Sequence, residues 1–316
     1  MIVVVGGLMS YVRLGLPDVG EAPELNVEAT PERIARGKYL ATSVALCVDC
    51  HSTRDFSKFA GPVIKGTEGK GGEEFNQEMG FPGRYYARNI TPTGIGDWTD
   101  GELFRAITSG VSKDGHALFP VMPYDNYSQL DQEDIYSIIA YIRTLKPIEH
   151  DIPPASSDFP MNFIINTIPQ KPNFQGIPAK SDEVKYGSYL LTAASCRHCH
   201  TPQVRGEFIV ERDLSGGNPF PLPNGITVYS ANITPDEETG IGRWTKEAFI
   251  NKFKTYANHE DSQVIGEGDF NTIMPWNEYA NMTTEDLGAI FSYLRTIPPI
   301  ENKVIRVEGQ LTAVRK

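Results

Sequence analysis

Cysteine is scarce in this chain, and the scarcity limits what the chain can be. Only four of its 316 residues are cysteine, and they form two Cys-x-x-Cys pairs, Cys47 with Cys50 and Cys196 with Cys199. No cysteine is left over for a disulfide framework or for a lone nucleophile. The function of the cysteines must therefore lie in the two pairs themselves.

Basic residues are fewer than acidic ones. The chain has 29 Lys and Arg residues against 40 Asp and Glu, a formal net charge of -11. A nucleic-acid partner is excluded, because binding phosphates requires a basic surface. With 40% hydrophobic and 22% charged residues, the composition is that of a globular protein long enough for two domains with cores of their own.

The apolar start of the chain is too short to cross a bilayer, which takes about 20 apolar residues. Residues 2–12 carry no charge, and Arg13 is the first charged residue. No basic segment precedes this run, so it is not a complete signal peptide. We expect the trailing end of a truncated membrane anchor; a frayed apolar start is the alternative.

The two halves of the chain repeat one another. Each carries, in the same order, a Gly-x-Tyr-Leu, a Cys-x-x-Cys-His, an Asn-Ile-Thr-Pro, a Gly-Ile-Gly-x-Trp, a Met-Pro and a closing Tyr-x-Arg-Thr. In the first half these motifs contain Gly37, residues 47–51, residues 89–92, Trp98, Met122 and residues 141–144; in the second they contain Gly187, residues 196–200, residues 232–235, Trp244, Met274 and residues 293–296.

The repeat divides the chain into four segments. We predict a lead-in with the anchor remnant at residues 1–30, a first domain at 31–147, a linker at 148–181 and a second domain with a short tail at 182–316. Seven prolines fall within residues 147–178, and such a segment cannot form regular helix or a central strand.

Helix signals flank the repeated motifs. Thr30 stands before a Pro-Glu pair, as an N-cap does, and Thr99 with Glu102 has the spacing of a capping box. Asp131 and Thr283 stand where the last helix of each half should begin. These signals predict an all-α fold.

The Cys-x-x-Cys-His motif has a specific chemistry. Its two cysteines form thioethers with the vinyl groups of haem, and its histidine binds the iron as the proximal ligand. We therefore predict two covalently bound haem c groups. The attachment residues are Cys47, Cys50, Cys196 and Cys199, and the proximal iron ligands are His51 and His200.

Two other uses of Cys-x-x-Cys fit less well. A zinc site needs four ligands, whereas each half offers two cysteines and a histidine in haem spacing. A thioredoxin-like redox pair belongs to a βαβ unit, which the sequence around the motifs does not indicate.

A sixth iron ligand is available in each half. Met122 and Met274 both precede a proline, follow the Gly-Ile-Gly-x-Trp loop and stand just before the last helix. His/Met is a common pairing in cytochromes c, so we predict that both methionines bind iron. The other candidates fit less well: Met79 has no counterpart in the second half, Met282 stands at the cap of a helix, and we expect His116 and His259 at the surface.

Five further residues are candidates for the haem environment. Trp98 and Trp244 could donate an indole N–H to a haem propionate, or serve as core tryptophans. Asn89 and Asn232 each open a rigid loop before a proline. The carbonyl of Pro62 could accept the proton of the first proximal imidazole.

At these motifs the chain resembles the haem c subunits of membrane-bound alcohol, aldehyde and gluconate dehydrogenases. The similarity covers about residues 31–147 and 182–299. It is carried by CVDCHSTRD, NITPTGIGDWTDGELFRAITSGVSKDGHALFPVMPY, CRHCHTP and NITPDEETGIGRW. The resemblance implies two tandem cytochrome c-like domains joined by the Pro-rich linker, whereas the family's subunits usually carry three haem domains.

The resemblance also implies a function and a location. His51 with Met122 and His200 with Met274 would be the axial pairs. The chain would pass electrons from a periplasmic or membrane dehydrogenase to a respiratory acceptor, on the periplasmic side of the cytoplasmic membrane and tethered to it. Its partners would be a redox donor and a redox acceptor.

The alternative function is that of a dihaem cytochrome c peroxidase. Such enzymes have similar length and two Cys-x-x-Cys-His motifs. They need one iron with an open coordination position and an acid–base residue beside it. The matching Met-Pro in both halves favours an electron carrier without substrate chemistry of its own.

The motifs predict two covalent haems per chain. Acidified acetone should leave the haem on the protein, because thioethers survive it, and the pyridine haemochrome assay should count two. A count of one, or haem extracted into the solvent, would contradict the assignment of the motifs.

Overall fold

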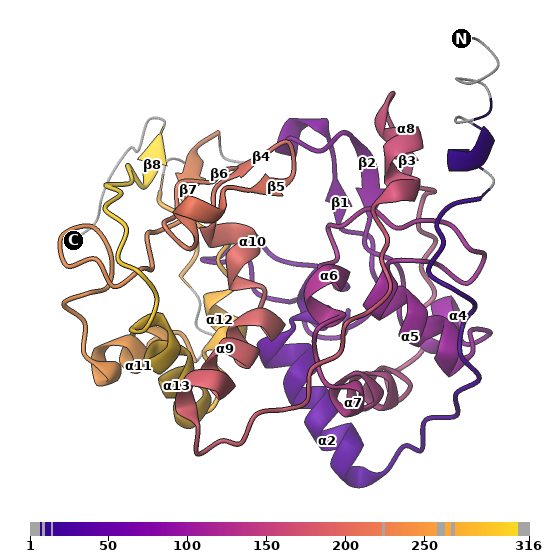
Figure 1. The fold of residues 1–316 in the computed structure, drawn as a ribbon, viewed down its shortest axis with the longest axis horizontal. Coiled ribbons are helices and arrows are strands. Elements are labelled where there is room, and N and C mark those ends of the chain that lie inside the picture. Colours follow the sequence, from indigo (N-terminus) through magenta and orange to yellow (C-terminus); the bar gives the residue numbers. More distant parts are fainter. Residues whose placement is uncertain are drawn as a thin grey trace. The chain divides into compact units, whose positions relative to one another are not determined.

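The computed structural model describes residues 7, 10–13, 15–222, 225–257, 263–266 and 269–308. The chain forms two compact units, shown in Figure 1. The first unit holds residues 1–41, 50–53 and 65–176, and the second holds residues 42–49, 54–64 and 177–316. The chain therefore crosses between the units several times around the first Cys-x-x-Cys-His.

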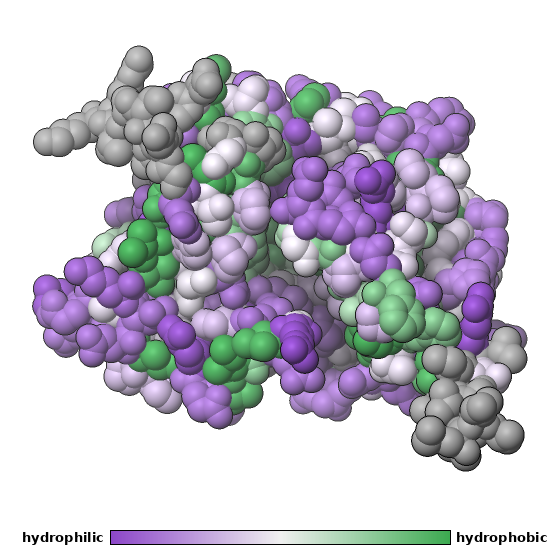
Figure 2. All heavy atoms as spheres, turned by 90° about the horizontal axis from the view of Figure 1, so that it is seen from above, coloured by the Kyte–Doolittle hydropathy of each residue, from purple (hydrophilic) through white to green (hydrophobic). Residues whose placement is uncertain are grey.

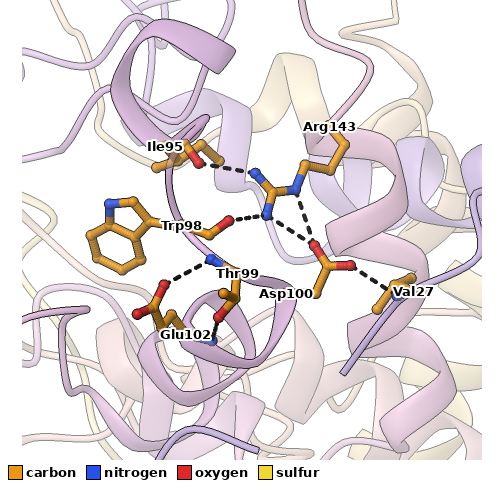
Figure 3. Close-up of polar contacts among 7 residues, drawn as sticks. All are labelled: Val27, Ile95, Trp98, Thr99, Asp100, Glu102 and Arg143. Carbon is orange, nitrogen blue, oxygen red and sulfur yellow. Dashed lines mark hydrogen bonds and ion pairs between the residues drawn. The ribbon is translucent and has the colours of Figure 1, made fainter. Parts of the chain in front are cut away.

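The first unit is built on short helices with the expected caps. They are α2 (Pro31–Tyr39), α4 (Pro92–Ile95), α5 (Asp100–Ser109), α6 (Tyr124–Tyr127), α7 (Gln132–Ile142) and α8 (Met161–Ile164), with the 3-10 turns η2 (Gln77–Met79) and η3 (Ile165–Thr167). Thr30 Oγ1 accepts a hydrogen bond from Arg33 N at 3.3 Å. Thr99 and Glu102 form the predicted capping box, which Figure 3 shows.

The second unit repeats this arrangement. Its helices are α9 (Glu183–Ala193), α10 (Cys196–His200), α11 (Lys246–Lys254), α12 (Trp276–Tyr279) and α13 (Thr284–Leu294), with the 3-10 turn η4 (Val210–Arg212). The π-helical turn η1 (Leu40–Val44) and the helical turn α3 (Cys47–Cys50) lie where the chain passes between the units. Asp131 and Thr283 cap α7 and α13, as predicted.

The prediction of an all-α fold is wrong. The chain is 36% helical and 9% strand, and its described part contains three small antiparallel sheets. Their strands are β1 (Glu74–Phe75), β2 (Gly83–Tyr86) and β3 (Ser156–Ser157); β4 (Gln203–Val204) and β5 (Glu207–Phe208); and β6 (Pro219–Pro221), β7 (Thr227–Tyr229) and β8 (Val307–Glu308).

Two of the three sheets take one strand from the segment that follows the last helix of a half. In the first unit the linker supplies β3, which pairs with β2; in the second the C-terminal tail supplies β8, which pairs with β7. Strands of two to four residues are too short to produce a recognisable alternation of polar and apolar residues. The sequence therefore gave no sign of them.

The first and last helices of each half cross at a glycine. A Cβ atom on Gly37 in α2 would lie 1.8 Å from the Ser137 oxygen and 2.9 Å from Cβ of Tyr141 in α7. A Cβ on Gly187 in α9 would lie 1.9 Å from the Ala289 oxygen in α13. Only glycine permits this approach.

Buried aliphatic residues lie mainly on these crossing helices and beside them. In the first unit the largest are Leu40, Leu130, Ile135, Ile138 and Ile139; in the second they are Leu190, Leu191, Leu214, Met282, Leu287 and Leu294. Each unit therefore has an aliphatic core of its own.

The described surface is mixed in polarity. On the face drawn in Figure 2, hydrophobic residues form several separate patches among hydrophilic ones. None of the helices in the described residues combines the length and the apolar character needed to cross a bilayer. The apolar start, predicted to be the remnant of an anchor, falls largely outside the described residues.

Substituting the crossing glycine tests the helix pairing. Gly37→Leu should lower the free energy of unfolding by about 1–3 kcal/mol or more, because the new side chain collides with the backbone of α7. Gly176→Ala is the control, since a Cβ there meets only Asp131 Oδ2, at 3.9 Å. Urea denaturation gives the free energy of unfolding of both variants. If Gly37→Leu leaves it unchanged, the pairing of α2 with α7 is wrong.

Candidate functional site

Both attachment motifs have the same local backbone. Each follows a residue in the left-handed conformation, Leu46 with φ 55° and Ser195 with φ 54°, which is uncommon for residues other than glycine. Each Cys-x-x-Cys then forms one helical turn, in α3 and in α10. Residues three apart on a helix are neighbours, so the two cysteines of each motif lie on the same side of the turn.

The four cysteines form no disulfide with one another, and all are partly buried. Burial raises the pKa of Cys47 and of Cys196 to about 12, and that of Cys199 to about 11. Redox-active and zinc-binding cysteines have lowered pKa values, because the thiolate is the reactive form. These surroundings thus favour the neutral thiol over the thiolate, unlike those of a redox-active pair.

Each histidine predicted to be a proximal ligand is oriented by a backbone carbonyl. Nδ1 of His51 lies 2.6 Å from the Arg88 oxygen, and Nδ1 of His200 lies 2.8 Å from the Ala231 oxygen. A carbonyl can only accept, so Nδ1 carries the proton and the lone pair of Nε2 is free to bind a metal.

Burial keeps both imidazoles neutral. It lowers the pKa of His51, and it lowers that of His200 to about 4. A neutral imidazole with one nitrogen held by a carbonyl is the form that binds iron. The residues therefore fit the proximal side of a c-type haem in both halves.

The carbonyl expected to orient His51 is a different one in the structure. The Pro62 oxygen accepts a hydrogen bond from Asp55 N at 3.0 Å, and the Nδ1 acceptor is Arg88 instead. A place for Pro62 near the haem stays a prediction. The acceptors in the two halves, Arg88 and Ala231, each directly precede the Asn of the Asn-Ile-Thr-Pro motif.

The Asn side chains fix the backbone next to these carbonyls. Oδ1 of Asn89 accepts from Thr91 N at 2.9 Å, and its Nδ2 donates to the Ile148 oxygen at 2.9 Å. Asn232 makes the same two contacts in the second half, with Thr234 at 3.0 Å and the Ile300 oxygen at 2.8 Å. The amides thus tie the turn to the segment after the last helix, while contact with haem stays a prediction.

A pair of glycines behind each histidine was not predicted from the sequence. Gly71 N donates to the His51 oxygen at 2.9 Å, and Gly216 N donates to the His200 oxygen at 2.7 Å. Both glycines have φ 72°, and a Cβ on either would lie 2.6 Å or less from backbone atoms. The sequence signal was the recurring Gly-Gly at residues 71–72 and 216–217.

The two Met-Pro segments share one conformation. The Met122 oxygen accepts from Tyr124 N at 2.8 Å, and the Met274 oxygen accepts from Trp276 N at 2.8 Å. The prolines that follow have φ and ψ of -78° and 59° in the first half and -79° and 66° in the second. Each Met lies in the same unit as its predicted partner histidine, and iron binding by either stays a prediction.

The competing sixth ligands show no such correspondence. The Met79 side chain is 40% exposed, whereas Met282 is only 1% exposed. His116 is exposed, and His259 lies outside the described residues.

The two tryptophans differ in their surroundings. In Figure 3 the Trp98 indole points away from the ion pair between Arg143 and Asp100, while its backbone oxygen accepts a hydrogen bond from Arg143. Trp244 is 38% exposed. Their contact with haem propionates stays a prediction.

A buried charge cluster adjoins the first motif. Arg54 Nη1 lies 3.0 Å from Asp49 Oδ2, with side chains 10% and 4% exposed. Burial, together with the nearby Asp49, raises the pKa of Glu278 to about 8. The cluster could not be predicted from the sequence, because Glu278 lies more than 200 residues from Asp49 and Arg54.

Glu278 should make stability depend on pH. Between its ordinary pKa of 4.5 and its folded pKa of about 8, the folded protein keeps a proton that the unfolded chain releases. The free energy of unfolding should therefore fall as pH rises, by at most about 1.4 kcal/mol per pH unit. In urea denaturation across this range, Glu278→Gln should reduce the fall in the free energy of unfolding. The control Glu237→Gln changes an exposed residue and should show the wild-type fall. If the free energy of unfolding depends on pH equally in both variants, Glu278 is not its source.

The chain was compared with known proteins. It is 29% identical over 300 residues to the cytochrome c subunit of a quinone alcohol dehydrogenase from Gluconacetobacter polyoxogenes, covering 89% of this chain and 59% of the relative. It is 30% identical over 281 residues to the fructose dehydrogenase cytochrome subunit of Gluconobacter japonicus, covering 84% and 52%. A dihaem cytochrome c-type protein of Cereibacter sphaeroides is 28% identical over 269 residues, covering 81% and 83%.

No protein-family model matches the chain. The chain spans between half and two thirds of the length of the dehydrogenase subunits that it matches. The relatives are between 25% and 30% identical over most of this chain. The resemblance expected from the motifs is therefore confirmed: the chain is a homologue of the cytochrome c subunits of alcohol, gluconate and fructose dehydrogenases.

Proposed function

We propose that the chain binds two haem c groups and carries electrons between redox proteins, without substrate chemistry of its own. The observation that carries this proposal is the equivalence of the two sites. Both present a neutral histidine whose Nδ1 faces a backbone carbonyl, and both present a Met-Pro with the same backbone.

The residues that would hold each haem can be named. In the first site they are Cys47, Cys50, His51 and Met122; in the second they are Cys196, Cys199, His200 and Met274. Bound haem supplies an iron that takes up and releases one electron.

The protein's own contribution is orientation and exclusion of water. The carbonyls of Arg88 and Ala231 hold the imidazoles in the tautomer with Nε2 unprotonated. Burial of both rings keeps them neutral. The Met side chains are half-buried, so each is partly screened from competing water.

The equivalence also separates a carrier from the dihaem peroxidase. A peroxidase needs one iron with an open coordination position. Here both histidines have the same acceptor geometry, and both methionines have the same backbone conformation. This equivalence favours two irons that each have all coordination positions filled. The peroxidase function is therefore disfavoured.

The relatives indicate the kind of partner. Their printed names are those of cytochrome subunits of alcohol, gluconate and fructose dehydrogenases. We infer a dehydrogenase as electron donor, a respiratory acceptor, and a location on the periplasmic side of the cytoplasmic membrane with a membrane tether. Purification of the native complex from membranes would identify the donor.

Replacing one methionine at a time tests the proposal. A thioether ligand raises the potential of haem iron relative to a second imidazole. Met122→His should lower one potential by a measurable part of the range of about 0.8 V that axial ligands span, and Met274→His should lower the other. A redox titration measures both potentials.

The wild-type protein is the reference for these variants. Its oxidised form should show the far-red band of sulfur bound to iron, and each variant should lose about half of that band by counting two like sites. A wild-type protein with one Met-bound iron and rapid turnover of peroxide would favour the peroxidase instead.

A further inference from the structure

The segment that follows the first attachment motif packs within the second unit. Residues 54–64 belong to that unit. They pair with the chain ahead of Met274: Phe59 N donates to the Gln263 oxygen at 2.9 Å, and Ile265 N donates to the Ser57 oxygen at 2.8 Å. Two segments that are about 200 residues apart in sequence thus run side by side.

Asn271 is the side chain that joins these segments. Its Oδ1 accepts from Ala60 N at 2.9 Å, and its Nδ2 donates to the oxygens of Phe56 at 3.1 Å and Lys58 at 3.4 Å. Oδ1 also accepts from Thr272 N at 2.8 Å. Asn271 is 4% exposed, and both ends of its buried amide are satisfied by backbone groups.

The connection continues to Met274. Thr272 Oγ1 accepts a hydrogen bond from Met274 N at 3.1 Å, and Thr272 is itself 7% exposed. Asn271 therefore fixes the chain three residues before the predicted iron ligand, and Thr272 fixes the backbone of that ligand directly.

In the first half, the segment before Met122 is held by a different kind of contact. The residue three positions before Met122 is Phe119, whose ring stacks on Tyr85 with centroids 4.2 Å apart and planes 16° apart. Tyr85 lies in β2 and is 6% exposed. An aromatic contact thus stands where the second half has a buried amide, so the role of Asn271 is specific to the second site.

We propose that Asn271 is a positioning residue for Met274, holding the methionine where it can bind the second iron. The proposal rests on the proposed function, in which His200 and Met274 are the axial pair. The hydrogen bonds of the amide together oppose movement of the segment that would carry the Met sulfur away.

The test uses the full-length protein with both haems attached. Asn271→Ala should reduce the far-red band of the oxidised protein towards half of its wild-type intensity. Imidazole should bind about tenfold more tightly to one of the two ferric haems, which corresponds to about 1.4 kcal/mol in favour of the Met-free form. The haem count should stay at two, because the thioethers are not involved.

A matched control is available in the same unit. Asn281 is an exposed asparagine whose Nδ2 donates to the Asn277 oxygen at 3.2 Å. Asn281→Ala should leave the far-red band and imidazole binding unchanged. Hydrogen exchange at Ala60 N should become faster in Asn271→Ala and not in Asn281→Ala.

A second variant decides the question if Asn271→Ala does not load both haems. Thr272→Val removes the acceptor of the Met274 N–H and leaves the contacts of Asn271 in place. It should also weaken the far-red band and strengthen imidazole binding at one haem. An unchanged band in Thr272→Val would then overturn the proposal.

Met274→Ala distinguishes the two claims. If Met274→Ala loses half of the band while Asn271→Ala keeps all of it, the positioning role is wrong and the axial pair stands. If Met274→Ala itself keeps the whole band, Met274 is not a ligand, and the proposed axial pair and the role of Asn271 fail together.

Discussion

The hydrogen bond from each proposed proximal histidine to a backbone carbonyl is the contact on which the rest of each half depends. The carbonyls of Arg88 and Ala231 select the tautomer that leaves Nε2 free. The asparagine that follows each carbonyl fixes the turn two residues further on, and its amide also binds the chain after the last helix. The last helix in turn packs on the first through a glycine, and the first helix leads back to the attachment motif.

The two halves keep this framework and differ around the sixth ligand. The segment before Met122 is held by an aromatic stack on Tyr85, whereas the segment before Met274 is held by the buried amide of Asn271. The second unit also buries a carboxyl group, Glu278, close to Asp49. The two irons would therefore share their ligands and differ in their surroundings, which is how a protein sets two different potentials with one ligand set.

The sequence predicted the features that depend on residue type, and it missed those that depend on backbone position. The caps at Thr30 and Thr99 are confirmed, because each needs a particular side chain. The all-α prediction is wrong because strands of two to four residues leave no pattern. The acceptor of the His51 proton was assigned to Pro62 and is Arg88, since a backbone carbonyl has no sequence signature. Asn271 was missed because its partners lie about 200 residues away.

The central claim is that both irons are bound by a histidine and a methionine. Proton NMR of the fully reduced protein tests it most directly, because the haem ring current shifts the methyl group of a bound methionine far upfield, outside the range of other protein signals. The account predicts two such methyl signals, one lost in Met122→Ala and the other lost in Met274→Ala. A spectrum with one signal or none would contradict it.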